Sequence, residues 1–468
     1  MRRRRTRTGG QPIGRLVLGL LLGVTLAWAA PAGAGGYADR VVETVLPNGL
    51  KLIMLEDHKA PVVVFQLYYR VGSRNESLGH TGLSHILEHV MFKGTDKVGP
   101  EEYSKIIQRN GGRTNAWTTE DATTYYATLA SDRVGVVIDL ESDRMTNLKL
   151  TDEVFLPERS VIMEERRLRV DNNPVSDLFE QLSSTSYAAH PYQFPVIGWM
   201  SDVAQATLAD ALLHYRTYYI PNNAFIVAVG DFDHTKLGDQ IAAAFGPIPS
   251  QAPPPQVRAI EPPQRGERRV EVKRQAQLPF VALAHHVPNL RANDAAALEV
   301  LAAILSGGDS ARLHQELVYR SRLAREAGAS YDYTNIDPGL FTVYAQPLPG
   351  KSAAAVEAAL QHELQRVADA EPTPRELEKA KNGIEAQFVF AQDSLFYQAM
   401  ELGEYEVAGD WRRIDDYLPA VRAVTAADVL RAARTYLRPE NRTTAVLVPD
   451  PPVAAPTGAD RVPKGMIN

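Results

Sequence analysis

A weak repeat in the order of expected elements is the feature that most constrains the fold of this chain. Each half shows strand patterns, then two helical patterns, then one long strand pattern and further helices. The expected strands lie at 41–57 (a hairpin), 61–71, 113–129, 279–285 and 327–345. The expected helices lie around 85–89, at 100–110, 132–147, 157–169, 295–305 and 311–320, and from 351 and 374 onward. This order predicts a duplicated α+β fold in which two similar domains, each a mostly antiparallel sheet with helices on one face, lie opposite one another.

Composition indicates where the domains begin and end. Five arginines within residues 2–7, an apolar run at 16–30 and the small residues Ala32, Gly33 and Ala34 predict a secretory signal peptide at 1–34. A Sec-type signal is expected, with twin-arginine export as the alternative, so the protein is expected to be periplasmic or secreted. The run is shorter than the roughly twenty residues of a membrane span, although an uncleaved anchor stays open. The remaining expected segments are an N-terminal domain at 37–247, a Pro-rich linker at 248–268, a C-terminal domain at 269–450 and a tail at 451–468.

The charge balance excludes some classes of function. Removal of residues 1–34 takes away six arginines and no acidic residue, so the net charge changes from −6 to −12. An acidic protein is a poor partner for nucleic acid, which requires a basic surface. The chain has no cysteine, so disulfides and thiolate chemistry are excluded and a metal site must use nitrogen and oxygen ligands.

The pentapeptide His-Ile-Leu-Glu-His contains His85, Glu88 and His89. On a helix, positions i and i+4 share a face, so both imidazoles can bind one metal ion with the carboxylate beside them. Zinc-dependent hydrolysis needs two such ligands, a carboxylate that takes a proton from water, and an open coordination position. The order His-x-x-Glu-His is the inverzincin signature. Thr81 or Ser84 is expected to cap this helix, and a pair of structural core histidines is the alternative interpretation.

A third protein ligand is expected from a distant element, because catalytic zinc sites commonly add a carboxylate to two histidines. Glu158, Glu164 and Glu165 lie on the helix expected at 157–169. Glu158 and Glu165 are seven residues apart, which is two turns, so they share a face, whereas Glu164 points elsewhere. The alternative is that these carboxylates form an ordinary solvated helix surface.

Further motifs follow one another in a defined order along the chain. They are residues 82–89, 92–95, 111–116, the helix at 158–165, His190-Pro191-Tyr192, 219–224 and 229–232. In this combination, over about residues 41–450, the chain resembles the pitrilysin family of zinc peptidases, and within it the short members similar to the mitochondrial processing peptidase.

The resemblance implies a clamshell-like half chamber and a complete metal site. In the family, a glutamate about 76 residues beyond the second histidine completes the zinc site, and here that position is Glu165. One Zn2+ per chain would then be held by His85, His89 and Glu165, with Glu158 supporting a ligand. Glu88 would take a proton from the water that zinc activates.

The resemblance also implies a place for the substrate. In the family, the segment that matches Asn115 and Ala116 is an edge strand, along which a peptide substrate binds in extended form. The asparagine side chain would hold the substrate backbone next to the bond that is cut. The alternative for Asn115 is a residue that only turns the chain after two glycines.

The second half departs from the family pattern. Members that cleave peptides usually carry an arginine and, seven residues later, a tyrosine, but Val318 and Arg325 stand at these positions here. A partner is therefore expected, a homologous subunit that supplies the Arg/Tyr pair to this zinc-bearing subunit. Arg320 or Arg322 could substitute if the alignment shifts.

Together these features predict an exported zinc metalloendopeptidase that hydrolyses extended peptides as the catalytic subunit of a heterodimer. No nucleic-acid partner and no stable membrane span after signal cleavage are expected. Two alternatives stay open: a catalytically silent zinc-containing scaffold or peptide-binding subunit, and a structural zinc module, whose metal would have four protein ligands.

Overall fold

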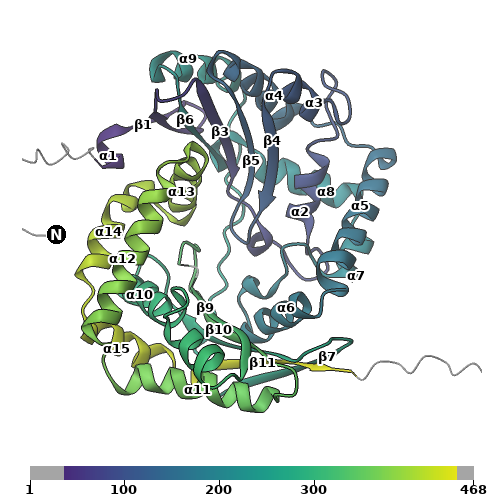
Figure 1. Cartoon of the computed structure of the whole chain (residues 1–468). Helices are drawn as coiled ribbons and strands as arrows, with labels where there is room; N and C mark the ends of the chain where they lie inside the picture. The colour runs from purple at the N-terminus through teal and green to yellow at the C-terminus, as the bar shows by residue number, and fades with distance from the viewer. Residues whose placement is uncertain (1–35, 332, 451–468) are drawn as a thin grey trace, which may run out of the picture.

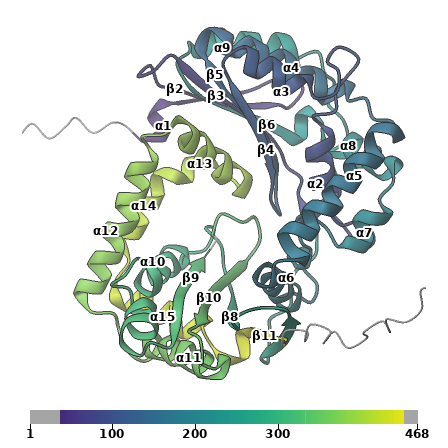
Figure 2. The same cartoon turned by 45° about the vertical axis from the view of Figure 1, so that its right-hand side comes forward.

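The computed structural model describes residues 36–331 and 333–450. The expected signal peptide at 1–34 and the tail at 451–468 lie outside the described residues. Two β-sheets stand at opposite ends of the molecule, and helices of the same half cover the outer side of each (Figures 1 and 2). This two-part arrangement of mixed helix and sheet confirms the predicted fold class. Within the described ranges, no helix has the length and apolar character needed to cross a membrane.

The N-terminal sheet has six strands in the order β1-β2-β6-β3-β5-β4. Its strands are β1 (Val41–Val45), β2 (Lys51–Glu56), β3 (Val62–Tyr69), β4 (Arg113–Thr118), β5 (Thr123–Ala130) and β6 (Ala224–Gly230). All neighbours are antiparallel except β2 and β6, which run parallel. The central strand β3 is apolar on both sides because both faces of the sheet are covered. Strand β4 lies at the edge, so one of its sides is open to pairing with another strand.

The described part of the first half contains nine α-helices, and α2, α4 and α9 among them share one core with this sheet. The nine are α1 (Tyr37–Arg40), α2 (Leu83–Val90), α3 (Glu102–Arg109), α4 (Val134–Asn147), α5 (Asp152–Arg166), α6 (Pro174–Ser186), α7 (Met200–Gln205), α8 (Leu208–Tyr218) and α9 (His234–Phe245). Leu87 of α2, Val137 of α4 and Ile241 of α9 are fully buried in one core with Phe65 of β3. This core fixes α2 on the sheet, close to β4 and β5.

The second half repeats this plan. Its sheet, in the order β7-β11-β8-β10-β9, contains β7 (Arg268–Arg274), β8 (Phe280–Val287), β9 (Ala324–Tyr331), β10 (Gly339–Pro347) and β11 (Arg442–Pro449). Its helices are α10 (Ala295–Ser306), α11 (Ala353–Asp369), α12 (Pro374–Ala391), α13 (Leu395–Ala408), α14 (Ile414–Ala423) and α15 (Ala426–Tyr436). Helices α10, α11 and α15 contact one face of the sheet. The duplication expected from the sequence is therefore present in the structure.

The two halves interlock by exchanging one helix each. Helix α13 of the second half packs on β3 and β6, where a Cβ at Gly403 would lie 2.1 Å from Cζ of Tyr68. Only glycine permits so close an approach. In return, α6 of the first half packs on β7, β8 and β11, with Leu178 and Leu182 buried against Phe280. Each sheet is therefore covered on both faces, once by its own half and once by the other.

Three predicted elements need correction. The long strands expected at 113–129 and 327–345 are each two antiparallel strands, β4–β5 and β9–β10. The turn after β4 contains neither glycine nor proline. It is made instead by the Thr119 hydroxyl, which accepts hydrogen bonds from the backbone N–H groups of Asp121 and Ala122. The helix expected at 157–169 begins earlier, at Asp152, and continues as a π-helical segment at Arg167–Asp171.

Candidate metal centre

Helix α2 begins without the predicted side-chain cap from Thr81 or Ser84. Gly82 occupies the N-cap with φ of 86°, a left-handed conformation that favours glycine. The buried Glu76 carboxylate caps the helix instead, because it accepts hydrogen bonds from the backbone N–H groups of Gly82 (2.6 Å) and Ser84 (2.7 Å). Burial raises the pKa of Glu76 to about 7. The first turn of α2 is thus fixed by a residue that lies nine positions before His85.

His85 and His89 lie on the same face of α2, as their spacing predicts, with ring centroids 4.7 Å apart. His85 is 7% exposed and His89 is half-buried. Burial, together with the charges of His89 and Arg169, lowers the pKa of His85 to about 3. His85 is therefore neutral at physiological pH, which is the form that binds a metal ion.

Helix α5 brings Glu165 to the two histidines. Its Oε2 lies 3.3 Å from Nε2 of His89 and 4.0 Å from Nε2 of His85. The three ligand atoms all lie within 4.8 Å of one another, and these three residues form the candidate metal cluster of the described chain. Two imidazole nitrogens and one carboxylate oxygen are the donor set of many catalytic zinc sites. The residues present therefore fit zinc, with a further coordination position left for water or substrate.

The other side of the His89 ring binds Glu158. Nδ1 of His89 lies 2.9 Å from Oε1 of Glu158, and Oε2 of Glu158 lies 2.7 Å from Nζ of Lys93. Burial would raise the pKa of Glu158, but the hydrogen bonds from His89 and Lys93 outweigh it, and the pKa is lowered. An ionised Glu158 places the imidazole proton on Nδ1 and directs Nε2 toward Glu165. The structure thus places Glu158 where a group that supports a ligand is expected.

Replacement of Glu158 by glutamine is expected to weaken zinc binding by about 10- to 100-fold, because His89 loses the charged partner that fixes its orientation. The measurement is a zinc titration against a chromophoric chelator. Glu153→Gln on the exposed first turn of the same helix is the matched control and should bind zinc like the unmodified protein. Equal affinities for both variants would show that the contact between Glu158 and His89 has no influence on the metal.

Zinc binding is also expected to weaken on acidification. Burial lowers the pKa of His89, but the hydrogen bond to Glu158 and the charges of Glu165 and Glu88 outweigh it, so the pKa of His89 is raised in the metal-free protein. A proton on His89 must leave before the metal binds, so below this pKa the affinity should fall about tenfold per pH unit. Competition titrations between about pH 5 and pH 8 measure the slope. An affinity that does not change over this range would contradict the assignment of His89 as a ligand.

Glu88 faces the same space as the metal ligands. The Thr118 hydroxyl, at the end of β4, donates a 2.6 Å hydrogen bond to its Oε2. Burial raises the pKa of Glu88, against the lowering effect of this hydrogen bond. A carboxylate with a raised pKa is a better general base at neutral pH. Thr118 lies two residues beyond the predicted Ala116, and the sequence did not indicate that its hydroxyl reaches Glu88.

A cavity of 670 Å³ contains the predicted site. Its wall includes His85, Glu88, His89, Asn115, Ala116 and Glu165, with Trp117, Thr118, Arg169, Val170 and residues 195–197 around them. All of the lining residues lie in the first half of the chain. Asn115 is exposed on the edge strand β4, whereas the Ala116 side chain is buried in the core, so Ala116 can offer substrate only its backbone. Their role in binding substrate stays a prediction.

Arg169 is a cavity residue that the sequence did not single out. It lies one turn beyond Glu165, in the π-helical segment, and its Nη1 is 2.8 Å from Oε1 of Glu165. This contact leaves Oε2 of Glu165 on the side of the histidines. The i+4 spacing was visible in the sequence, but other oppositely charged pairs in this segment, such as Glu164 and Arg167, have similar spacing. Arg169 is also the one arginine or lysine among the residues that line the cavity.

The residues at the positions of the family's Arg/Tyr pair lie away from the cavity. Val318 is half-buried against the C-terminal core, and Arg325 is exposed on β9. Arg320 pairs with Glu316 on the same segment, and Arg322 is exposed with φ of 48°. None of these four residues lines the cavity that contains Glu88. The chain therefore does not supply an Arg/Tyr pair to its own cavity from these positions, and neither Arg320 nor Arg322 takes its place there.

Comparisons with known proteins agree with this geometry. Residues 51–198 match the description "Insulinase (Peptidase family M16)", and residues 205–384 match "Peptidase M16 inactive domain". Zinc protease PqqE of Helicobacter pylori is 32% identical over 439 residues, which are 92% of this chain and 98% of the relative. An uncharacterized zinc protease of Streptomyces coelicolor is 32% identical over 85% of this chain and 87% of the relative. The crystal structure of a protease from Helicobacter pylori matches with a TM-score of 0.85 and 32% identity, over 88% of this chain and 99% of that one. The resemblance to pitrilysin-type zinc peptidases is thereby confirmed, and the chain belongs to the M16 family of zinc proteases.

Proposed function

We propose that this protein is an exported zinc-dependent endopeptidase that cuts extended peptides in the cavity beside β4. The observation that carries the proposal is the convergence of His85, His89 and Glu165 in one cavity that also contains Glu88. Zinc bound by these three ligands would make water a stronger nucleophile and would polarise the substrate carbonyl. Relatives named zinc proteases support the same chemistry.

The chain's own residues supply the remaining steps. Glu88 accepts a proton from the attacking water and passes it to the nitrogen of the leaving amine. Because the Thr118 hydroxyl binds Oε2, we assign the proton transfer to Oε1. The substrate pairs its backbone with the open side of β4, where Asn115 can bind the peptide group next to the bond that is cut. Backbone pairing accepts many sequences, so an extended conformation is the main requirement on the substrate.

The negative charge that develops on the carbonyl oxygen still needs a donor. Arg169 is paired with Glu165, and Val318 and Arg325 lie outside the cavity. Loss of such a donor costs about 10² to 10³ in rate in other hydrolases. We therefore propose that a homologous subunit brings an arginine and a tyrosine to this site, which makes the chain the zinc-bearing half of a heterodimer.

The test compares the purified chain alone with the chain mixed with a candidate subunit that carries the Arg/Tyr pair. We expect one zinc ion per chain and slow cleavage of an unstructured peptide alone, with a rise of about 10² to 10³ on addition of the subunit. Fast cleavage by the isolated chain would overturn the proposed partner but keep the peptidase. One zinc per chain with no cleavage by any mixture would favour the scaffold alternative, in which the bound metal has no catalytic role.

A further inference from the structure

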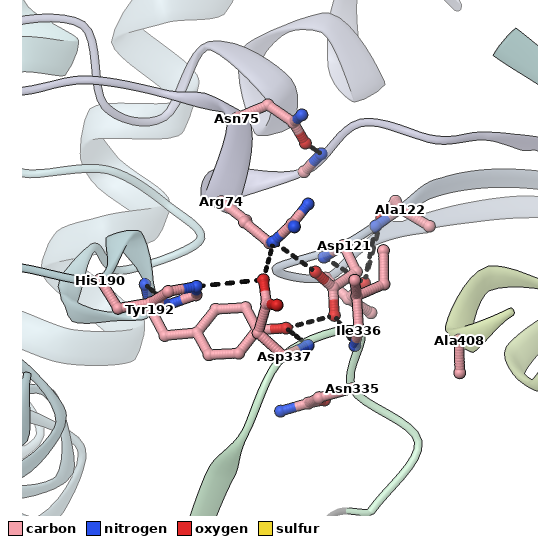
Figure 3. Close-up of polar contacts among 12 residues, drawn as sticks. Arg74, Asn75, Asp121, Ala122, His190, Tyr192, Asn335, Ile336, Asp337 and Ala408 are labelled. Carbon is pink, nitrogen blue, oxygen red and sulfur yellow. Dashed lines mark hydrogen bonds and ion pairs between the residues drawn. The ribbon is translucent and has the colours of Figure 1, made fainter. Parts of the chain in front are cut away.

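A buried polar network joins the end of β4 to the second half of the chain (Figure 3). Asp121, in the turn between β4 and β5, is 5% exposed. Its Oδ2 accepts hydrogen bonds from the Tyr192 hydroxyl (2.7 Å) and from the backbone N–H of Ile336 (2.9 Å). Its Oδ1 lies 3.7 Å from Nε of Arg74. Three segments of the first half and one loop of the second therefore meet at this carboxylate.

Asp337 completes the network from the second half. Its carboxylate accepts a hydrogen bond from Nε of Arg74 (2.6 Å) and from Nε2 of His190 (3.1 Å), and its backbone N–H donates to the Tyr192 hydroxyl (3.1 Å). Nδ1 of His190 accepts from the backbone N–H of Tyr192, which assigns the ring proton to Nε2. The motif His190-Pro191-Tyr192, which the metal site leaves without a role, thus holds both aspartates.

The loop that carries Asp337 is itself fixed to the second half. Nδ2 of Asn289 donates to the backbone carbonyls of Asn335 (2.9 Å) and Ile336 (2.7 Å), and the backbone N–H of Leu290 donates to the carbonyl of Tyr333 (2.9 Å). Because the loop at 333–338 is held at these points, its hydrogen bond to Asp121 fixes the turn after β4 relative to the second half.

On its other side, the same turn is held by backbone contacts. The N–H groups of Ser73 and Arg74 donate to the carbonyls of Thr119 (3.3 Å) and Glu120 (2.9 Å). A Cβ at Gly72 would lie 2.3 Å from the carbonyl oxygen of Thr119, so only glycine allows this approach. The turn is therefore held between the Ser73–Asn75 segment and the loop at 333–338.

The turn between β4 and β5 directly follows Thr118, the residue whose hydroxyl binds Glu88. Asp121 lies three residues beyond Thr118, and β4 offers the substrate its open edge. A shift of the turn would move the Thr118 hydroxyl and the substrate-binding edge together, relative to α2. Displacements of about 1 Å in a site of this kind can cost about 10² in rate.

Building on the proposed function, we propose that Tyr192, Asp121 and the loop at 333–338 are positioning residues. They hold the end of β4, with the Thr118 hydroxyl, in a fixed position relative to the metal ligands on α2. The second half of the chain, which has no metal cluster among its described residues, thereby contributes to the reaction without touching substrate. Removal of one hydroxyl from the network should slow turnover more than it weakens substrate or zinc binding.

The variant Tyr192→Phe tests this role, because it deletes the hydroxyl that joins Asp121 to Asp337. We expect kcat to fall about tenfold, with KM within about twofold and zinc content unchanged. The matched control is Tyr37→Phe, which deletes a buried hydroxyl bonded to Gln392 and Glu401 of the second half. Tyr37 precedes β1, at the opposite edge of the same sheet, so this control should retain full activity.

Two readouts separate positioning from general stability. In a double-mutant cycle, Tyr192→Phe added to Thr118→Val should lower kcat by much less than Tyr192→Phe alone, because both act through the same contact. In hydrogen exchange followed by mass spectrometry, the segment 113–130 should exchange faster in Tyr192→Phe and in Asp337→Asn, but not in Tyr37→Phe.

The outcomes are distinct from those of the proposed function. Equal kcat and equal exchange in Tyr192→Phe and Tyr37→Phe would overturn the positioning role. Loss of zinc from Tyr192→Phe would also overturn it, as would a fall in kcat that is just as large in the Thr118→Val background, since a general structural role would then explain the result. If the unmodified protein cleaves no peptide with any partner, the proposed function fails, while the exchange of 113–130 still decides whether the network holds β4.

Discussion

The variant Glu88→Gln is expected to keep one zinc ion per chain and to lose peptide cleavage by about 10² to 10⁴. Glutamine has the same size, and its amide oxygen can still accept the hydrogen bond from Thr118. It cannot take a proton from water, so only the general-base step is removed. Cleavage rates and metal content measured on the same sample check this prediction.

Thr118→Val gives a graded control for Glu88→Gln. It removes the hydrogen bond to Oε2 but leaves the carboxylate, so we expect a loss of about tenfold rather than complete inactivation. If Glu88→Gln cleaved peptides as fast as the unmodified protein, the general base would be another group. If Glu88→Gln lost its zinc, Glu88 would belong to the support of the metal rather than to proton transfer.

The variant Glu165→Gln is expected to lose zinc. A neutral amide is a poor zinc ligand, and the substitution leaves the Arg169 guanidinium beside the site without its carboxylate partner. The loss of affinity should exceed the 10- to 100-fold that removal of a supporting residue costs. Metal analysis after gel filtration and a chelator competition measure the effect.

Glu164→Gln is the matched control for Glu165→Gln. Glu164 precedes Glu165 on α5, its side chain is 65% exposed, and it pairs with Arg167 rather than with a histidine. Glu164→Gln should therefore bind zinc normally, and both variants should melt cooperatively as metal-free proteins. Normal zinc content in Glu165→Gln would contradict its place in the ligand set and would require a different third ligand.

The sequence predicted the fold class and most elements because apolar periodicity and turn residues are local signals. It failed at the two hairpins taken as single long strands, and only the second of them has a proline and a glycine, Pro338 and Gly339, at the end of its loop. The turn after β4 is made by the Thr119 hydroxyl and fixed by Asp121, whose partners Tyr192 and Ile336 lie far along the chain. Such a turn carries no glycine or proline signal, so local patterns cannot show it.

The candidate site was predictable only in part from local sequence. The spacing of His85 and His89 on one face of a helix needs no tertiary information. Glu165 had to be separated from other carboxylates on its helix by resemblance to known peptidases, and the structure then brings it to 3.3 Å from His89. Thr118 and Arg169 were missed because their roles depend on strand pairing and on a π-helical segment.

The two halves contribute differently to the site, and the difference follows from how they pack. The first half contains every residue that lines the cavity. The second half covers one face of the N-terminal sheet with α13 and holds the turn after β4 with the loop at 333–338. A half whose described residues form no metal cluster can therefore still be needed for the activity of the other. Because α13 and α6 each pack on the sheet of the other half, we expect the two halves to unfold together.

The most direct test of the central claim is metal-dependent cleavage of an unstructured peptide of about 25 to 30 residues. The protein, with its candidate partner subunit, is stripped of metal, assayed, reloaded with one equivalent of zinc and assayed again, and the products are identified by mass spectrometry. We predict cuts at internal peptide bonds that disappear with the metal, return with zinc and are absent in Glu88→Gln. Cleavage that persists without metal or in Glu88→Gln, or a fully zinc-loaded complex that cuts nothing, would contradict the account.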